Sequence, residues 1–213
     1  MPRFVPPPLY VICDQEVCER AGWRVLDFAS ACLQGGAALL QLRAKHATGR
    51  AMLETAEAMV RRAEAVGARI IVNDRADIAS LAGAAGVHVG QDDLAPAAVR
   101  RVTRDIAIVG LSTHTPEQFT RGLDEPVDYV TIGPVFGTAT KATGYSAVGL
   151  EGVRAVSART VEHISLVAIG GITLERARDV RAAGAHSLAV IGDMFVGGDP
   201  AARVRQYLDL LQV

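Results

Sequence analysis

The chain has 213 residues, 50% of them hydrophobic, and a formal net charge of -1 at pH 7. This length fits one domain of the larger kind, and the near-neutral charge offers no general attraction to nucleic acid or to an anionic membrane. Any recognition of phosphate must come from a few placed groups, so small phosphorylated molecules are more suitable ligands than polymers.

The first eight residues form a Pro-rich extension that lacks the apolar segment of a signal peptide. No stretch is long and apolar enough to cross a bilayer, so we expect a cytoplasmic protein. Composition does not shift along the chain, which predicts a single domain over residues 1–213. The chain has three cysteines, Cys13, Cys18 and Cys32. Because their number is odd and they lack CxxC spacing, they indicate neither a disulfide framework nor a structural zinc site.

Short apolar or β-branched runs recur along the chain and read as strands. Eight are predicted: Leu9–Cys13, Ala37–Leu42, Arg69–Val72, Gly86–Val89, Ile106–Leu111, Val127–Ile132, Ile164–Ile169 and Ser187–Ile191. Helical periodicity separates them, as in residues 51–66, where apolar side chains recur every three or four positions. Glycines 67, 86 and 184 are predicted to close helical units.

Strand followed by helix, eight times over, is typical of an α/β fold of the closed (β/α)8 TIM-barrel type. A doubly wound open sheet is the alternative, but it usually has fewer strands, and the first turn here carries no GxGxxG. In a barrel the chemistry lies at the carboxyl ends of the strands. Polar residues directly after each apolar run are therefore the candidates.

The second strand runs out into Gln41, Arg43 and Lys45, which alternate and so share one face of the extended backbone. Two cations and an amide suit a diphosphate, with Arg as a bidentate donor and Lys as a point charge. A solvated basic strand end is the alternative explanation of this triplet.

Carboxylates follow the next two strands. Asn73 and Asp74 come after the third strand, and Asp92 and Asp93 after the fourth. Two carboxylates beside a cationic phosphate site match Mg2+, which keeps several waters and is completed by substrate phosphates. Either Asp74 or Asp93 alone could instead cap a helix, and Asp92 is ambiguous; their convergence favours Asp74 and Asp93 as metal ligands.

The fifth strand ends in Ser112, Thr113 and His114, where a hydroxyl can donate to a phosphate oxygen. No nucleophile elbow surrounds Ser112, which argues against covalent catalysis. His114 can carry a proton or pack in support, and packing is the preferred interpretation. His88, between two valines of the fourth strand, reads as a satisfied histidine of the barrel interior.

The longest loop follows the sixth strand and reads GPVFGTATKATGYSAVG, with Thr138, Thr140 and Lys141 as clustered donors. Its length and composition indicate a mobile lid rather than an idle surface loop. After the seventh strand, Gly170 and Gly171 allow close backbone approach to an anion, and Gly192 takes the equivalent place after the eighth. Together these glycines predict a second site, of monophosphate size.

The segments QLRAK, VNDR, HVGQDD, GLSTHT, GTATK, IGGI and VIGD occur in this order and cover most of the chain. In these segments and their order, the chain resembles the thiamine phosphate synthase family. The resemblance implies a Mg2+-dependent transferase. Its expected reaction joins 4-amino-2-methyl-5-pyrimidinylmethyl diphosphate to 4-methyl-5-(2-phosphoethyl)thiazole and releases pyrophosphate.

The resemblance also implies roles for individual residues. The pyrimidine diphosphate would be held by Gln41, Arg43, Lys45, Asn73, Ser112 and Lys141, of which Arg43, Lys45, Ser112 and Lys141 are the catalytic candidates. The metal ligands would be Asp74 and Asp93. The thiazole phosphate would be held by Thr138, Thr140, Gly171, Ile191 and Gly192. The family more typically has Pro at position 137 and Ser at position 192, where this chain has Gly.

Two other functions remain as alternatives. A thiazole tautomerase on the same scaffold would need no diphosphate site, and a non-catalytic sensor would only bind the phosphorylated ligands. The intact basic triplet and acidic pair argue against the tautomerase. A closed barrel has no free strand edge, so both a monomer and a small homo-oligomer are compatible with the sequence.

Overall fold

The eight predicted strands form one closed parallel barrel. The computed structural model describes residues 4–104, 108–137 and 144–211. The strands pair in sequence order, and β1 closes the ring by pairing with β8. Their bounds are β1 Leu9–Asp14, β2 Leu39–Arg43, β3 Arg69–Asn73, β4 Gly86–Val89, β5 Ile108–Thr113, β6 Tyr129–Ile132, β7 Ser165–Ile169 and β8 Ser187–Val190.

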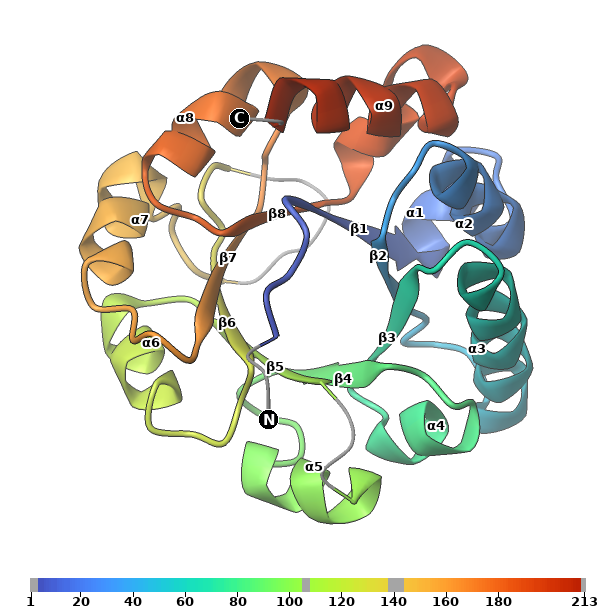
Figure 1. Cartoon of the computed structure of the whole chain (residues 1–213), viewed down its shortest axis with the longest axis horizontal. Helices are drawn as coiled ribbons and strands as arrows, with labels where there is room; N and C mark the ends of the chain where they lie inside the picture. Colours follow the sequence, from blue (N-terminus) through green and yellow to red (C-terminus); the bar gives the residue numbers. More distant parts are fainter. Residues whose placement is uncertain (1–3, 105–107, 138–143, 212–213) are drawn as a thin grey trace.

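Helices surround the barrel as an outer ring (Figure 1). Between β1 and β2 lie α1 Gln15–Arg20 and α2 Val25–Gln34, and a short 3-10 helix, η1 Gly192–Gly198, separates β8 from the last helix. The others are α3 Gly49–Glu64, α4 Ala76–Leu81, α5 Pro96–Thr103, α6 Pro116–Gly122, α7 Gly149–Ser157, α8 Leu174–Ala182 and α9 Pro200–Leu211. The (β/α)8 prediction is confirmed.

Alternation along each strand divides the core into two layers. On β1, Tyr10 and Ile12 pack inside the barrel with side chains of other strands, such as Leu39. The intervening Leu9 and Val11 belong to the larger cluster between strands and helices. Every second strand position therefore faces the barrel interior, and the last of these positions project into its mouth.

The N-terminal segment closes the opposite end of the barrel. Residues 4–8 run across the opening (Figure 1). The Phe4 ring lies 6.2 Å from that of Tyr129, and Ser165 Oγ donates to the Phe4 carbonyl at 3.3 Å. Pro8 extends the ladder by accepting from Leu188 N at 2.9 Å. Because this end is closed, ligands must enter at the carboxyl ends of the strands.

Glycine at position 110 of β5 leaves room for polar side chains in the barrel interior. A Cβ here would lie 2.1 Å from Tyr129 Cζ and 2.5 Å from His88 Nδ1. Any larger residue would displace Tyr129 or His88, both of which lie inside the barrel. Glycine at this position therefore permits the hydrogen-bonded floor described below.

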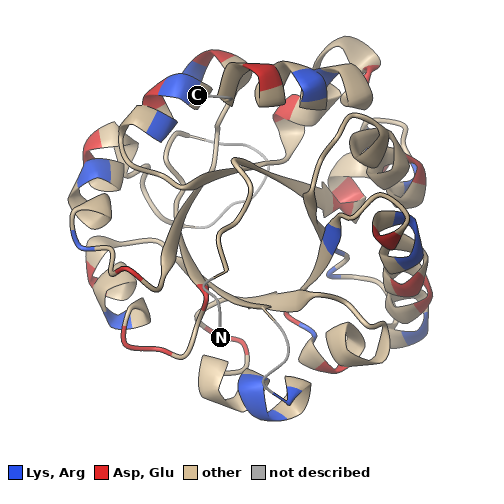
Figure 2. Ribbon diagram, viewed as in Figure 1, with Lys and Arg blue, Asp and Glu red and all other residues tan. Residues whose placement is uncertain are grey.

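Charged residues lie mainly on the outer helices and turns, while the strands carry few (Figure 2). No helix within the described ranges has both the length and the apolar character needed to span a bilayer.

Candidate functional site

The basic end of β2 is held by the end of β1. Arg43 Nη1 donates to Asp14 Oδ2 in an ion pair, and both side chains are largely buried. The other carboxylate oxygen of Asp14 caps α1 by accepting from Val17 N at 3.1 Å. Asp14 thus fixes the guanidinium of Arg43 at the mouth. Asp14 is not among the predicted site residues, although it directly follows a predicted strand, which is the signal that identified Asp74.

Lys45, Asp74 and Asp93 come together beside this pair. Lys45 Nζ lies 3.2 Å from Asp74 Oδ2. Burial and, next, the neighbouring Asp93 carboxylate raise the pKa of Asp74, while Lys45 lowers it. The two carboxylates are therefore close enough to interact, as predicted from their adjacent strands.

Local backbone geometry places each carboxylate. Asp74 adopts a left-handed conformation, with φ of 64°, and its amide donates to the His88 carbonyl at 2.8 Å. Asp tolerates this region better than most residues, which explains its use at a strand end. Asp93 closes a tight turn by accepting from Gly90 N at 2.7 Å through Oδ2. Asp92 is exposed.

The acidic pair fits a magnesium ion better than a metal that needs a full set of protein ligands. Among the described residues, no group of three or more His, Cys, Asp or Glu is placed to hold a metal. Mg2+ is usually bound by one or two carboxylates, with water and substrate phosphates completing its shell. Burial contributes most to the raised pKa of Asp74, and the neighbouring Asp93 carboxylate adds to it; a bound cation would relieve this second interaction.

A chain of polar side chains crosses the floor of the mouth. Gln41 Nε2 donates to Tyr10 Oη at 2.6 Å, and Tyr10 Oη lies 3.0 Å from Tyr129 Oη. Tyr129 Oη is 3.1 Å from His88 Nδ1, whose Nε2 is 3.3 Å from Ser112 Oγ. The predicted residues Gln41 and Ser112 are thus held from opposite sides of the barrel, and His88 is an interior histidine, as predicted.

Burial keeps the two tyrosines of this floor uncharged. It raises the pKa of both Tyr10 and Tyr129 well above the ordinary tyrosine value, so both hydroxyls stay protonated at neutral pH. Asn73 ends β3 with 8% of its surface exposed, at the rim of the same floor. The floor therefore presents hydroxyl and amide groups, which suit a neutral heterocycle.

A cavity of about 300 Å3 opens on the other side of the mouth. Its lining includes the predicted Gly171, Ile191 and Gly192, and also Ser112, which reaches it from the floor. Gly170 and Gly171 have φ of 102° and 63°, a backbone conformation that other residues rarely adopt. Glycine therefore allows their amides to point in directions that are seldom open to other residues. The residues predicted to bind the monophosphate therefore lie together, as far as they belong to the described part of the chain.

The start of the β6 loop forms one wall of this cavity. Phe136 N donates to the Gly170 carbonyl at 3.0 Å, and a Cβ at Gly171 would lie 2.7 Å from the Gly137 carbonyl oxygen. Close packing of the two loops thus requires glycine at position 171. His114 Nδ1 lies 2.7 Å from the Gly133 carbonyl oxygen, and its ring stacks on Tyr145 at 4.4 Å, a supporting arrangement. Thr138, Thr140 and Lys141 lie outside the described residues.

Known proteins resemble this chain along most of its length. A family model described as thiamine monophosphate synthase matches residues 9–194. A thiamine-phosphate synthase of Koribacter versatilis is 43% identical over 207 residues, covering 96% of each chain. Another, from Azorhizobium caulinodans, is 36% identical over 214 residues, covering all of this chain and 98% of its own.

A solved structure is similar along nearly the whole chain. Thiamine phosphate pyrophosphorylase from Pyrococcus furiosus superposes with a TM-score of 0.85 at 28% sequence identity, covering 96% of both chains. The two proteins therefore share the same barrel fold over nearly their whole length.

Proposed function

The chain belongs to the thiamine monophosphate synthase family, and on that premise we propose how its barrel mouth works. The enzyme is a transferase that condenses 4-amino-2-methyl-5-pyrimidinylmethyl diphosphate with 4-methyl-5-(2-phosphoethyl)thiazole. The products are thiamine phosphate and pyrophosphate. One half of the mouth would bind the diphosphate with its metal, and the other half the monophosphate.

The diphosphate would lie over the ends of β2, β3 and β4. Arg43 and Lys45 would donate to its oxygens, with Lys141 and Asn73 completing the contacts. Asp74 and Asp93 would hold Mg2+, which would neutralise the charge that develops on the leaving pyrophosphate. The placement of Lys45 beside Asp74 supports this arrangement, because cation and carboxylate then serve the same bound diphosphate.

The aminopyrimidine would rest on the polar floor. Gln41 Nε2 donates to Tyr10 Oη, so its carbonyl oxygen would accept from the 4-amino group of the ring. Ser112, held by His88, would contact the same substrate from across the barrel. These two residues would set the ring so that its methylene carbon faces the thiazole.

The thiazole phosphate would occupy the cavity after β7 and β8. Gly171, Ile191 and Gly192 would contact it through backbone amides, and Thr138 and Thr140 would add hydroxyl donors. With both substrates bound, the thiazole nitrogen would face the methylene carbon across the mouth. Holding the two reacting atoms in this orientation would itself raise the reaction rate.

In the reaction the methylene C–O bond breaks and the oxygen keeps the electron pair. The electron-rich ring stabilises the positive charge left on the methylene carbon, so this bond can break before the new one forms. The lone pair of the thiazole nitrogen then forms the C–N bond, and no general base is needed. Arg43, Lys45 and Lys141 would stabilise the leaving oxygens, while the enclosed mouth keeps water from the cation.

A single domain over residues 1–213 would suffice for this chemistry, acting on small phosphorylated molecules. We place it in the cytoplasm as a monomer or small homo-oligomer. No contact with nucleic acid or a membrane is needed.

The observation that supports the proposal most is the convergence of Lys45, Asp74 and Asp93 opposite the glycine-lined cavity. Purified protein should be incubated with both substrates and Mg2+, and the products identified by mass. Thiamine phosphate with an equal amount of pyrophosphate supports the proposal. A tautomerase would instead rearrange a separately supplied thiazole carboxylate phosphate, followed by NMR because the tautomers share one mass, and would form no thiamine phosphate. Binding of the substrates without turnover would identify a sensor; either result would contradict the proposal.

A further inference from the structure

The described lining of the cavity proposed for the thiazole phosphate includes neither Lys nor Arg. The nearby Arg176 donates to the Gly171 carbonyl at 2.9 Å. Residues 170–173, Gly192 and Asp193 line much of the cavity, and their backbone amides are the groups that we take to bind the phosphate. These two segments belong to different βα units, so the spacing between their amides depends on whatever ties the segments together.

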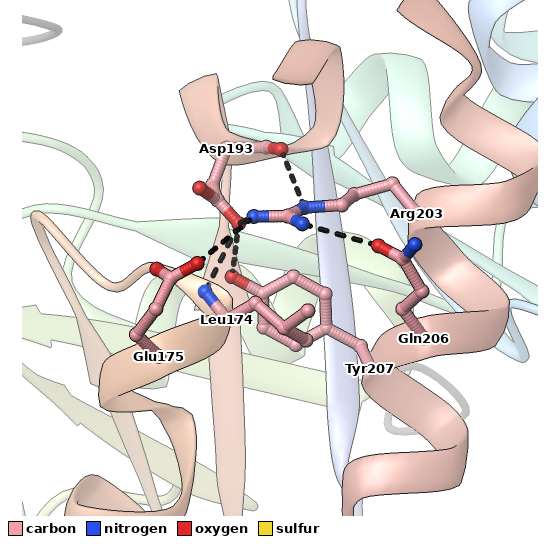
Figure 3. Close-up of polar contacts among 6 residues, drawn as sticks. All are labelled: Leu174, Glu175, Asp193, Arg203, Gln206 and Tyr207. Carbon is pink, nitrogen blue, oxygen red and sulfur yellow. Dashed lines mark hydrogen bonds and ion pairs between the residues drawn. The ribbon is translucent and has the colours of Figure 1, made fainter. Parts of the chain in front are cut away.

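Asp193 makes that tie (Figure 3). Its Oδ2 accepts from Leu174 N, the first residue of α8, at 3.1 Å. The same oxygen accepts from Tyr207 Oη at 2.6 Å and from Arg203 Nη2 at 2.8 Å, both on α9. Arg203 Nε lies 3.2 Å from the Asp193 backbone carbonyl as well. One carboxylate therefore joins η1, the start of α8 and the face of α9.

The contact with α8 replaces a cap that the helix does not provide for itself. Thr173 stands at the N-cap of α8, but its side chain makes no capping hydrogen bond. An uncapped first-turn amide is normally satisfied by a local side chain. Here the cap comes from Asp193, on the next βα unit, so the position of the cavity wall after β7 is coupled to the wall after β8.

Charge makes the same network necessary. A carboxylate in the wall of an anion site would repel a phosphate, and only 7% of the Asp193 side chain is exposed. The Arg203 guanidinium, 10% exposed, offsets this charge, and Tyr207 donates to the same oxygen. Burial and then Asp193 raise the pKa of Tyr207, so its hydroxyl keeps the proton that it donates. Gln206 accepts from Arg203 Nη1 at 3.1 Å and holds the guanidinium in place.

We propose that Asp193 is a positioning residue for the monophosphate half of the site. Its carboxylate, neutralised by Arg203 and Tyr207, sets the spacing of the two backbone segments that bind the phosphate of the thiazole substrate. The inference rests on the proposed function, because it takes the cavity as the site of that phosphate. It assigns Asp193 no contact with the pyrimidine diphosphate.

The first test is Asp193→Asn, which keeps the size of the side chain and removes its charge. KM for the thiazole phosphate should rise about tenfold, while KM for the pyrimidine diphosphate and kcat stay within about twofold. Asp128→Asn is the matched control. Asp128 pairs with Arg100 at 2.7 Å and accepts from Val109 N at 2.8 Å, at the closed end of the barrel. That variant should lower the melting temperature without changing either KM. Tyr207→Phe, which removes a single hydrogen bond, should raise the thiazole KM two- to threefold.

The second test separates charge from packing. Arg203→Met leaves the Asp193 carboxylate without its cation, so the KM for the thiazole phosphate should rise more than in Asp193→Asn. Adding Asp193→Asn to Arg203→Met should then recover at least part of the loss. If the double variant is no better than Arg203→Met, the electrostatic part of the inference is wrong.

Calorimetry with the thiazole phosphate alone measures binding without turnover. Tenfold weaker binding by Asp193→Asn, with normal binding by Asp128→Asn, supports the inference. Equal binding by Asp193→Asn and the unmodified protein overturns it but leaves the proposed function standing. Absence of binding by the unmodified protein overturns the proposed function itself, and with it the inference.

Discussion

Asp14 and Arg43, the last residues of two neighbouring strands, form an ion pair at the mouth of the barrel. They are also register partners in the β1–β2 ladder, so the pairing follows from the parallel alignment of the two strands. The contact holds a long, flexible side chain in one orientation before substrate arrives, and preorganisation of this kind lowers the cost of binding.

Asp14→Asn should therefore weaken binding of the pyrimidine diphosphate. The substitution keeps an oxygen to cap α1 but removes the charge that orients Arg43. A charge-assisted hydrogen bond contributes about 1.5 to 3 kcal/mol, so we expect KM for this substrate to rise at least tenfold. Steady-state kinetics with each substrate varied in turn measures the effect. An equal rise in both KM values would mean a general disturbance of the mouth rather than release of Arg43.

Gly171→Ala should disturb the thiazole phosphate site. The new Cβ would meet the Gly137 carbonyl oxygen at 2.7 Å, and the residue has a φ of 63°. We expect the thiazole KM to rise more than tenfold. Gly83→Ala is the matched control, because φ is 67° there and no atom lies within 4 Å of the new Cβ. Both variants carry the backbone strain of about 1 kcal/mol, so only the loop contact distinguishes them. Equal thiazole KM values in the two variants would contradict the assignment.

The three cysteines should resist thiol reagents in the folded protein. All are buried, and burial raises the pKa of Cys18 to about 12 and those of Cys13 and Cys32 above their ordinary value. The thiolate is the reactive form, so at pH 8 labelling should be slow until denaturant is added. A chromogenic disulfide reagent measures the rate. Fast labelling of the native protein would show that these thiols are accessible.

Stability should fall in alkali for the same reason. A thiol with a raised pKa in the folded state stays protonated there while the unfolded chain ionises, so its contribution is complete below pH 9 and declines toward pH 12. The slope is about 1.4 kcal/mol per pH unit for each such thiol. Urea unfolding at pH 8 and pH 10 measures it, and Cys18→Ala should reduce the slope. An unchanged slope in Cys18→Ala would contradict its assignment to this residue.

The barrel could be predicted because its signals are local. Each strand is a short apolar run, and the eight predicted runs overlap all eight observed strands. The differences lie at the ends: β2 begins at Leu39 rather than Ala37, because Ala37 N still donates to the Cys32 carbonyl of α2 at 3.0 Å. Gly86 does not close a helix; it starts β4, where a Cβ would lie 2.1 Å from the Ile108 carbonyl oxygen. The turn is made by Gly83, whose φ is 67°.

The candidate site could be predicted only in part. Residues at strand ends, such as Gln41, Asp74 and Gly171, follow from the rule that the mouth lies at the carboxyl ends. The partners that hold them come from distant positions. Tyr10 and Tyr129 read as ordinary apolar strand residues, and Arg203 and Tyr207 as residues of an amphipathic helix. Nothing local in the sequence shows that Asp193 joins that helix to the start of α8.

Asp74 and Asp93 are proposed to hold the magnesium ion of the diphosphate. The most direct measurement is thiamine phosphate formation as a function of Mg2+ concentration in Asp93→Asn and in Asp92→Asn. Asn at position 93 keeps an oxygen for Gly90 N but loses the charge, so we expect at least a hundredfold loss of activity and a higher Mg2+ requirement. Asp92→Asn removes the same charge at the neighbouring, equally exposed position and should match the unmodified protein. Unchanged turnover and Mg2+ dependence in Asp93→Asn would contradict the account.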